Sequence, residues 1–246
     1  MKNKKAIYLV NGITMLRIIG ALTIPFVNLF LSPTGLVIYI ICLLLTDALD
    51  GFLAKRLKAC TVFGSLLDQA ADKILGITIL AVLAVDYPVM LLPLFTEILI
   101  VVVNMAAVRK GATGDSTILG KIKTLFLGIT IIGGFSAIYA REIMGMITDH
   151  TPLGVMLNNI FYYLDTNITT VMTGVAFISL GTGLMVVCDY YLRARNDIKK
   201  AKEKGLNSKD IKLKTGKELM EALFCPEYYQ KNKNQPLIKK IGCSKN

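Results

Sequence analysis

Four aspartates stand out because they lie within otherwise apolar stretches of the sequence. Asp47 and Asp50 are spaced i, i+3, and Asp68 and Asp72 are spaced i, i+4. In an α-helix, either spacing places both side chains of a pair on one face. Four carboxylates that converge in apolar surroundings repel one another unless cations neutralise them. Oxygen ligands of this type suit Mg²⁺, Mn²⁺ or Ca²⁺ rather than zinc. The spacing therefore predicts a divalent-cation site between two helices.

The rest of the chain has the composition of a membrane protein. Its 246 residues are 54% hydrophobic and 18% charged, and the mean hydropathy is +0.57. Soluble domains average about 45–50% apolar and about 25% charged residues. The difference excludes a soluble enzyme with a polar shell, and it excludes a disordered or collagen-like chain. We predict an all-α polytopic membrane protein.

Six apolar runs predict six transmembrane helices around a polar cavity. Turn-forming or polar residues separate several of them, as at residues 32–35, 86–88 and 109–117. We predict a loop over residues 140–167, with a short amphipathic helix at 143–147. The six runs are residues 18–31, 35–57, 64–85, 89–108, 125–139 and 171–188.

The basic residues predict the orientation of these helices. Lysines and arginines gather before the first run, between the second and third, between the fourth and fifth, and after the sixth. The opposite loops carry a single basic residue, Arg141, among acidic ones. By the positive-inside rule, both termini lie in the cytoplasm and the cavity opens there. We therefore predict a multi-pass protein of a prokaryotic plasma membrane, with its active site facing the cytoplasm.

The C-terminal segment is strongly basic. Its last 58 residues hold 15 lysines and arginines against 7 acidic residues, which favours attraction to anionic lipid headgroups. No nucleic-acid partner is expected, because no groove-reading motif accompanies the lysines. We predict a transmembrane domain over residues 1–195 and a basic cytoplasmic tail over 196–246. Within the tail, residues 199–217 form either an amphipathic surface helix or solvated chain.

The five cysteines have no metal-binding spacing and are expected to be free thiols.

The aspartates belong to a longer pattern that resembles a known family. From Asp47 to Asp72 the sequence follows D-x2-D-G-x2-A-R-x8-G-x3-D-x3-D, with Lys55 at the arginine position. This is similar to the signature of the CDP-alcohol phosphatidyltransferases. The segment from Asn11 through Thr14 to Arg17 is similar to the N-x2-T-x2-R stretch that opens many members.

The resemblance implies a reaction and a set of functional residues. A phosphatidyl group passes from CDP-diacylglycerol to a small polar or phosphorylated alcohol, and CMP is released. Two Mg²⁺ or Mn²⁺ ions assist, Asp72 acts as the general base, and a homodimer is expected by analogy. The metal ligands implied are Asp47, Asp50, Asp68 and Asp72, and the CDP contacts are Gly51, Lys55, Thr61, Asn11 and Thr14.

Other segments bear on the acceptor alcohol. Residues 119–124 and 189–192 are similar to phosphatidylglycerophosphate synthases, which favours glycerol 3-phosphate. Thr96 and Asn104 stand where that branch has arginines, so phosphatidylglycerol, serine and inositol phosphate remain alternatives. Glu97 and Asn104 share a helix face, and they either line the cavity or hold helices together. An anionic acceptor needs cations, and we predict that Lys121, Lys123, Arg109 and Arg17 supply them, with Lys73 as a further candidate.

Two other classes of protein also place acidic residues in a membrane. An ion or proton-coupled transporter predicts inverted repeats and broken helices, and the sequence shows neither. An intramembrane prenyltransferase needs two separate aspartate-rich motifs, and only one compact motif is present. The transferase interpretation therefore accounts best for the sequence.

Overall fold

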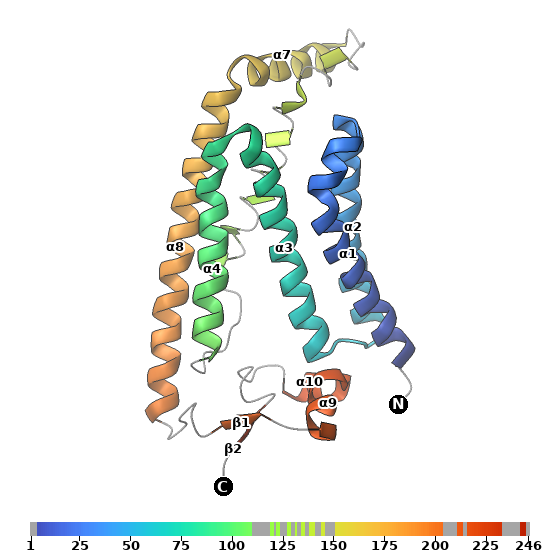
Figure 1. Cartoon of the computed structure of the whole chain (residues 1–246), viewed down its shortest axis with the longest axis vertical. Helices are drawn as coiled ribbons and strands as arrows, with labels where there is room; N and C mark the ends of the chain where they lie inside the picture. Colours follow the sequence, from blue (N-terminus) through green and yellow to red (C-terminus); the bar gives the residue numbers. More distant parts are fainter. Residues whose placement is uncertain are drawn as a thin grey trace.

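Long helices run side by side through most of the chain in the computed structural model (Figure 1). They are α1 (Lys4–Phe30), α2 (Pro33–Arg56), α3 (Val62–Asp86), α4 (Leu91–Arg109) and α8 (Ile168–Glu203), with a 3-10 turn η1 (Pro88–Met90) before α4. The structure describes residues 4–109, 119–120, 122–123, 127–128, 131, 134–135, 138–140, 144–145, 151–203, 211–213, 216–232 and 242–244.

The order of the helices in space differs from their order in the chain. Helix α1 packs against both α2 and α3, α3 packs against α4, and α4 packs against α8. The first helix therefore supplies one face to each of the two aspartate-bearing helices. This position makes polar residues of α1 part of any site that the aspartates form.

Polar caps fix the starts of the helices that carry the aspartates. The Ser32 hydroxyl accepts a hydrogen bond from the Gly35 amide at 3.3 Å at the start of α2. The Thr61 hydroxyl accepts one from the Gly64 amide at 3.0 Å at the start of α3. Such caps satisfy amides that the helix itself leaves without partners. Between the two helices, Lys58 adopts a left-handed backbone conformation with φ of 50°, which keeps the connection short.

Four helices in the described part of the chain are long and apolar enough to cross a membrane. They span Lys4–Phe30, Gly35–Arg56, Pro88–Ala107 and Ile168–Asn196, so the chain is an integral membrane protein. Helix α3 is equally long but carries Asp68, Asp72 and Lys73 close together. The predicted run 64–85 lies within α3, and about half of the run 125–139 falls outside the described residues. Six spans and a polar cavity open to the cytoplasm therefore stay predictions.

The helix that carries the first predicted span is longer than that span. The helix begins at Lys4 and not at residue 18, although its first half contains several polar residues. Thr14 and Arg17 are buried in the bundle, while Tyr8, Leu9 and Leu16 of the same helix are exposed. The polar residues thus face the neighbouring helices, and the apolar residues form part of the apolar outer surface.

The loop predicted over residues 140–167 is wrong in part, because it contains the helix α7 (Pro152–Thr166). The Thr151 hydroxyl caps α7 by accepting from the Gly154 amide at 3.2 Å. Figure 1 shows α7 lying across the end of the bundle and leading directly into α8. The amphipathic helix predicted at 143–147 falls mostly outside the described residues.

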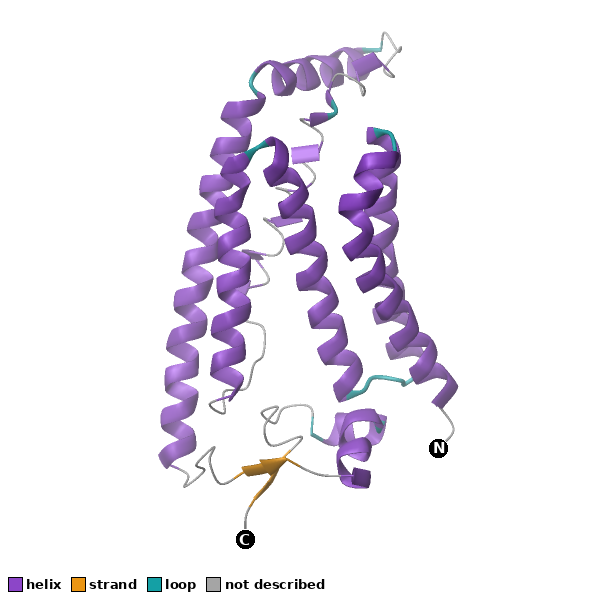
Figure 2. Ribbon diagram, viewed as in Figure 1, coloured by secondary structure: helices purple, strands orange, loops and turns teal. Residues whose placement is uncertain are grey.

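The C-terminal segment forms secondary structure at the opposite end from α7 (Figure 2). Strands β1 (Ile211–Leu213) and β2 (Gly242–Ser244) pair in antiparallel fashion, with helices α9 (Gly216–Phe224) and α10 (Pro226–Lys231) between them. A single surface helix over 199–217 is therefore wrong, since β1 lies within it. Helix α8 also continues through the predicted domain boundary at 195. Helix α9 contacts α3, where the Phe63 and Phe224 rings lie 5.0 Å apart.

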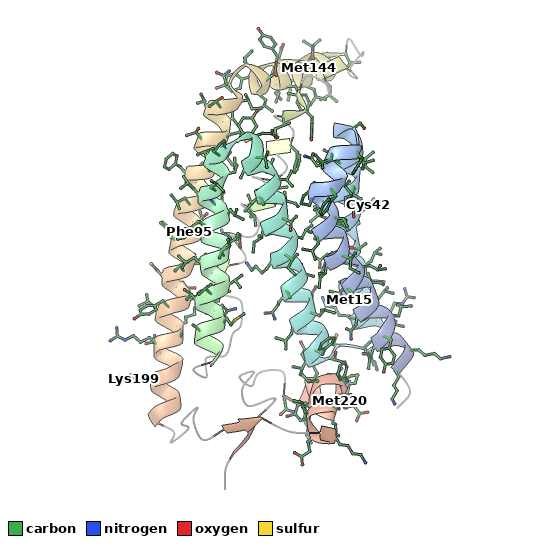
Figure 3. All side chains as sticks on the ribbon, in the orientation of Figure 1. Met15, Cys42, Phe95, Met144, Lys199 and Met220 are labelled. Carbon is green, nitrogen blue, oxygen red and sulfur yellow. The ribbon has the colours of Figure 1, made fainter. Side chains whose placement is uncertain are left out.

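Both the core and much of the outer surface are apolar, as expected for a protein in a membrane. Buried residues such as Ile24, Leu36, Ile79 and Met172 join α1, α2, α3 and α8 in one cluster. Large apolar side chains, including Met15 and Phe95, are exposed on the outside of the helices (Figure 3). An exposed apolar surface of this kind suits contact with lipid. Cys42, Cys60, Cys188 and Cys225 are free thiols, as predicted for these four.

Candidate active site

Arg17 of α1 lies at the centre of the four aspartates. Its side chain is completely buried. One terminal nitrogen, Nη1, pairs with Asp47 and lies 3.8 Å from Oδ2 of Asp50. The other, Nη2, lies 2.7 Å from Oδ1 of Asp68 and 3.5 Å from Oδ1 of Asp72. The two predicted pairs therefore converge, and a helix that neither pair belongs to connects them.

The four carboxylates differ in their exposure to solvent. The Asp50 side chain is 4% exposed, and the Thr14 hydroxyl lies 2.8 Å from its Oδ2. The side chains of Asp47, Asp68 and Asp72 are 46%, 46% and 55% exposed. One side of the cluster is thus held by α1, and the other is open to a ligand. Thr14, predicted to contact CDP, is placed as a partner of Asp50.

The arrangement fits a divalent metal ion. Carboxylate oxygens of Asp47, Asp50 and Asp68 all lie within 4.8 Å of one another. These are hard oxygen donors, which suit Mg²⁺ or Mn²⁺. Four carboxylates face a single guanidinium, so the group has capacity for further positive charge. The Nε atom of Arg17 is buried and has no hydrogen-bond partner among the described residues, so the guanidinium is not fully satisfied where it lies.

A second group of predicted residues meets at the start of α3. A methyl group on Gly64 would lie 2.9 Å from Oδ1 of Asn11 and 3.1 Å from Oγ1 of Thr61. Asn11 and Thr61, both predicted to contact the CDP group, therefore both lie against Gly64, where a larger residue would displace Asn11. This explains one fixed glycine of the signature by packing within the protein.

The other signature glycine has no such explanation. A methyl group on Gly51 would meet no atom within 4 Å, and Lys55, one turn further along α2, is exposed. Packing among the described residues therefore does not require glycine at position 51. The space beside it is open to a ligand that approaches the α2 backbone closely.

A buried carboxylate on α4, that of Glu97, forms ion pairs with two lysines. Glu97 is 2% exposed, and its Oε2 lies 3.1 Å from Nζ of Lys73 on α3. Its Oε1 pairs with the buried Lys123. Lys73 directly follows Asp72, so this lysine group adjoins the aspartate cluster. Of the other predicted acceptor contacts, Lys121 lies outside the described residues, and so does the side chain of Arg109.

Sequence reasoning did not assign Glu97 its two partners. It left open whether Glu97 lined a cavity or held helices together, and it treated Lys73 only as one of several cations. The signal that was present is chemical: a carboxylate in an apolar helix needs a cation. Which cation it finds depends on how α3 and α4 are rotated against each other, and the spacing of residues within each helix does not give that rotation.

Comparison with known proteins identifies the class of this membrane protein. Residues 7–155 match the model of the CDP-alcohol phosphatidyltransferase family. This segment covers more than half of the chain and includes every aspartate of the cluster together with Arg17. The chain belongs to the CDP-alcohol phosphatidyltransferase family. The predicted family, its enzyme class and its place in phospholipid biosynthesis are thereby confirmed, which sets aside the transporter and prenyltransferase interpretations.

Two curated relatives carry the same name. The CDP-diacylglycerol–glycerol-3-phosphate 3-phosphatidyltransferase of Aquifex aeolicus (strain VF5) is 28% identical over 127 residues, covering 49% of this chain and 70% of the relative. The protein of that name from Yersinia enterocolitica serotype O:8 / biotype 1B (strain NCTC 13174 / 8081) is 39% identical over 87 residues. That match covers 32% of this chain and 48% of the relative. No solved structure matches the chain.

Proposed function

We propose that this enzyme transfers the phosphatidyl group of CDP-diacylglycerol to glycerol 3-phosphate and releases CMP. The observation that carries the proposal is the position of the lysine group. Lys73 and Lys123 place two amino groups around the single carboxylate of Glu97. Lys73 directly follows Asp72 in α3, and we propose that a phosphorylated alcohol bound by the lysines presents its hydroxyl to that carboxylate. The names of the two relatives support the same acceptor.

The reaction is a displacement at phosphorus. The acceptor hydroxyl oxygen forms a bond to the phosphorus that carries diacylglycerol, and the bond from that phosphorus to the CMP oxygen breaks. CMP leaves with the bonding electrons, and the hydroxyl proton passes to Asp72. Two Mg²⁺ or Mn²⁺ ions held by Asp47, Asp50, Asp68 and Asp72 would neutralise the diphosphate and the charge that develops on CMP.

The residues of the chain divide the work of binding. Asn11, Thr61 and Lys55, with the open backbone at Gly51, are proposed to contact the CDP part of the donor. Thr14 acts through Asp50, whose carboxylate it orients. The acceptor phosphate binds to Lys123 and Lys73, and Lys121, Arg109 and Arg17 stay predicted contacts. The cytoplasmic orientation, the homodimer and the division at residue 195 also stay predictions, supported by the basic residues or by analogy.

An acceptor panel tests this proposal. CMP release from CDP-diacylglycerol by the purified enzyme in Mg²⁺ is measured with glycerol 3-phosphate, phosphatidylglycerol, serine and inositol phosphate in turn. We expect release with glycerol 3-phosphate. Release only with another acceptor would contradict the proposed substrate and leave the family reaction intact.

The lysine group can be tested separately. Lys123→Met is expected to raise KM for glycerol 3-phosphate at least about tenfold, because a charge-assisted contact to the phosphate is lost. The value of kcat and the KM for CDP-diacylglycerol should change little. Lys199→Met is the matched control, since Lys199 is exposed near the C-terminal end of α8 (Figure 3).

Loss of Lys123 also leaves Glu97 with one partner fewer. The double variant Lys123→Met/Glu97→Gln removes both charges and so guards against misfolding. An unchanged KM for glycerol 3-phosphate in the folded double variant would show that the lysine group only joins helices.

A further inference from the structure

Helix α7 has three chemically different faces. One face lies against the rest of the protein: Gly154 is buried, and Leu157, Phe161 and Leu164 are half-buried. These residues recur at intervals of three or four, as expected for one side of a helix. Leu164 packs against the central apolar cluster. This face accounts for how α7 is attached to the bundle.

A second face is apolar and exposed. Leu153, Met156, Ile160 and Tyr163 follow one another at helical spacing and are 63%, 56%, 43% and 62% exposed. Met156, Ile160 and Tyr163 also line a shallow groove of about 500 Å³ along the helix. No side chain among the described residues covers this stripe. In water, such a continuous apolar stripe would be unfavourable.

The third face is polar. Asn158 and Asp165 lie seven residues apart, and therefore on one side of the helix. Both belong to the flank away from the apolar stripe, and Asp165 is the only charged residue of α7. A helix with one apolar and one polar flank suits a boundary between lipid and water.

The position of α7 in the fold places it at such a boundary. The membrane-spanning part of α8 begins at Ile168, two residues after α7 ends at Thr166. Figure 1 shows α7 lying across the bundle at the end away from α9, α10 and the start of α1. Helix α8 exposes Phe177 and Ile178, so the apolar surface of α7 adjoins a lipid-facing helix. Tyr162 and Tyr163 are of the type enriched where a membrane meets water.

We propose that α7 is an interfacial helix that docks on the phospholipid surface of the leaflet opposite the aspartate cluster. The stripe of Leu153, Met156, Ile160 and Tyr163 enters the boundary between headgroups and acyl chains. Asn158 faces water. The helix thereby fixes the depth of the α8 terminus in the bilayer. The partner is the lipid surface itself, and this inference does not depend on the identity of the acceptor.

The sequence allows a clean spectroscopic test, because the chain contains no tryptophan. A single tryptophan is introduced at Met156 on the apolar stripe, at Asn158 on the polar flank, or at Phe177 on α8 as a lipid-facing reference. Each full-length variant is reconstituted into phosphatidylglycerol/phosphatidylcholine vesicles, with ordinary or brominated acyl chains. Gel filtration and thermal unfolding before reconstitution establish that each variant is folded.

We expect brominated lipid to reduce the fluorescence of Met156→Trp and Phe177→Trp at least about twofold. Asn158→Trp should respond little to brominated lipid and strongly to acrylamide in the water. Two results would overturn the proposal. Quenching of Met156→Trp by acrylamide alone would place the stripe in water. Quenching of folded Met156→Trp by neither agent would show that protein, such as a second copy of the chain, covers the stripe.

Discussion

The negative charge of the aspartate cluster is balanced by one side chain, that of Arg17. Its guanidinium touches or approaches carboxylates from both α2 and α3, and three of these carboxylates, those of Asp47, Asp50 and Asp68, form the candidate metal site. A guanidinium and a divalent cation that share these carboxylates repel each other. Arg17 therefore stabilises the cluster without metal and opposes metal binding.

Two opposite effects are expected from Arg17→Gln. In EDTA, the variant should lose about 3 kcal/mol of unfolding free energy, because the carboxylates of the cluster lose their shared cation. Its apparent Kd for Mg²⁺ should fall at least about tenfold, since a positive charge beside the ion is removed. Thermal unfolding at increasing Mg²⁺ measures both effects without relying on activity.

Arg17→Lys serves as the control because it keeps the charge and loses the planar fork. It should be less stable than the wild type in EDTA, with a Kd for Mg²⁺ closer to the wild-type value. Weaker Mg²⁺ binding in Arg17→Gln would contradict the competition and indicate that Arg17 instead positions the ligands.

The Gly64 position makes a second prediction at the scale of a residue. A methyl group there would displace Asn11 and disturb the Thr61 cap. Gly64→Ala should raise KM for CDP-diacylglycerol about tenfold and lower the unfolding free energy by about 1 kcal/mol. Steady-state kinetics and thermal unfolding measure the two effects. Gly12→Ala, whose added methyl group meets nothing within 4 Å, should leave KM unchanged; an equal effect in both variants would refute the explanation.

At the scale of elements, one close approach sets the distance between α4 and α8. A methyl group on Gly183 of α8 would lie 2.6 Å from Oγ1 and 2.7 Å from Cβ of Thr96 on α4. Thr96 is completely buried, and its hydroxyl donates to the Pro93 carbonyl at 2.8 Å. Its neighbour Glu97 holds the two lysines, so this helix contact also supports the proposed acceptor site.

Gly183→Ala is expected to separate these helices. The unfolding free energy should fall by about 2 kcal/mol, because a buried backbone–side-chain contact is overpacked. Gly181→Ala on the same helix adds a methyl group that meets nothing within 4 Å, and should be neutral or slightly stabilising. Thermal unfolding of both variants decides the matter; equal stability would contradict the close contact.

The sequence predicted some elements better than others for physical reasons. Apolar runs near the length of a bilayer identified α2, α4 and α8, since no soluble alternative explains them. Helix α7 was missed because its apolar residues face two directions, protein and lipid, within 15 residues. The strands β1 and β2 are three residues each and pair across a long separation in the chain. Such pairing leaves no local pattern to read.

At the scale of the whole molecule, the spacing of the aspartates in the sequence was enough to predict that they lie together. It was not enough to predict which cations they contact. The i, i+3 and i, i+4 pairs each define a helix face whatever the fold. Their common contact with Arg17 depends on α1 lying against both α2 and α3. The approach of Lys123 to Glu97 likewise depends on the global packing. The sequence therefore predicted the metal ligands of the candidate site, but not the basic side chains that pair with its acidic residues.

The central claim is that this membrane bundle uses the aspartate cluster to transfer a phosphatidyl group. The most direct measurement is Mg²⁺-dependent CMP release from CDP-diacylglycerol and glycerol 3-phosphate, comparing wild type with Asp72→Asn. The exchange removes the proposed base and keeps the shape of the side chain. We predict release by the wild type and a reduction of about 10²–10⁴-fold in the folded variant. Equal rates in the two proteins would contradict the claim.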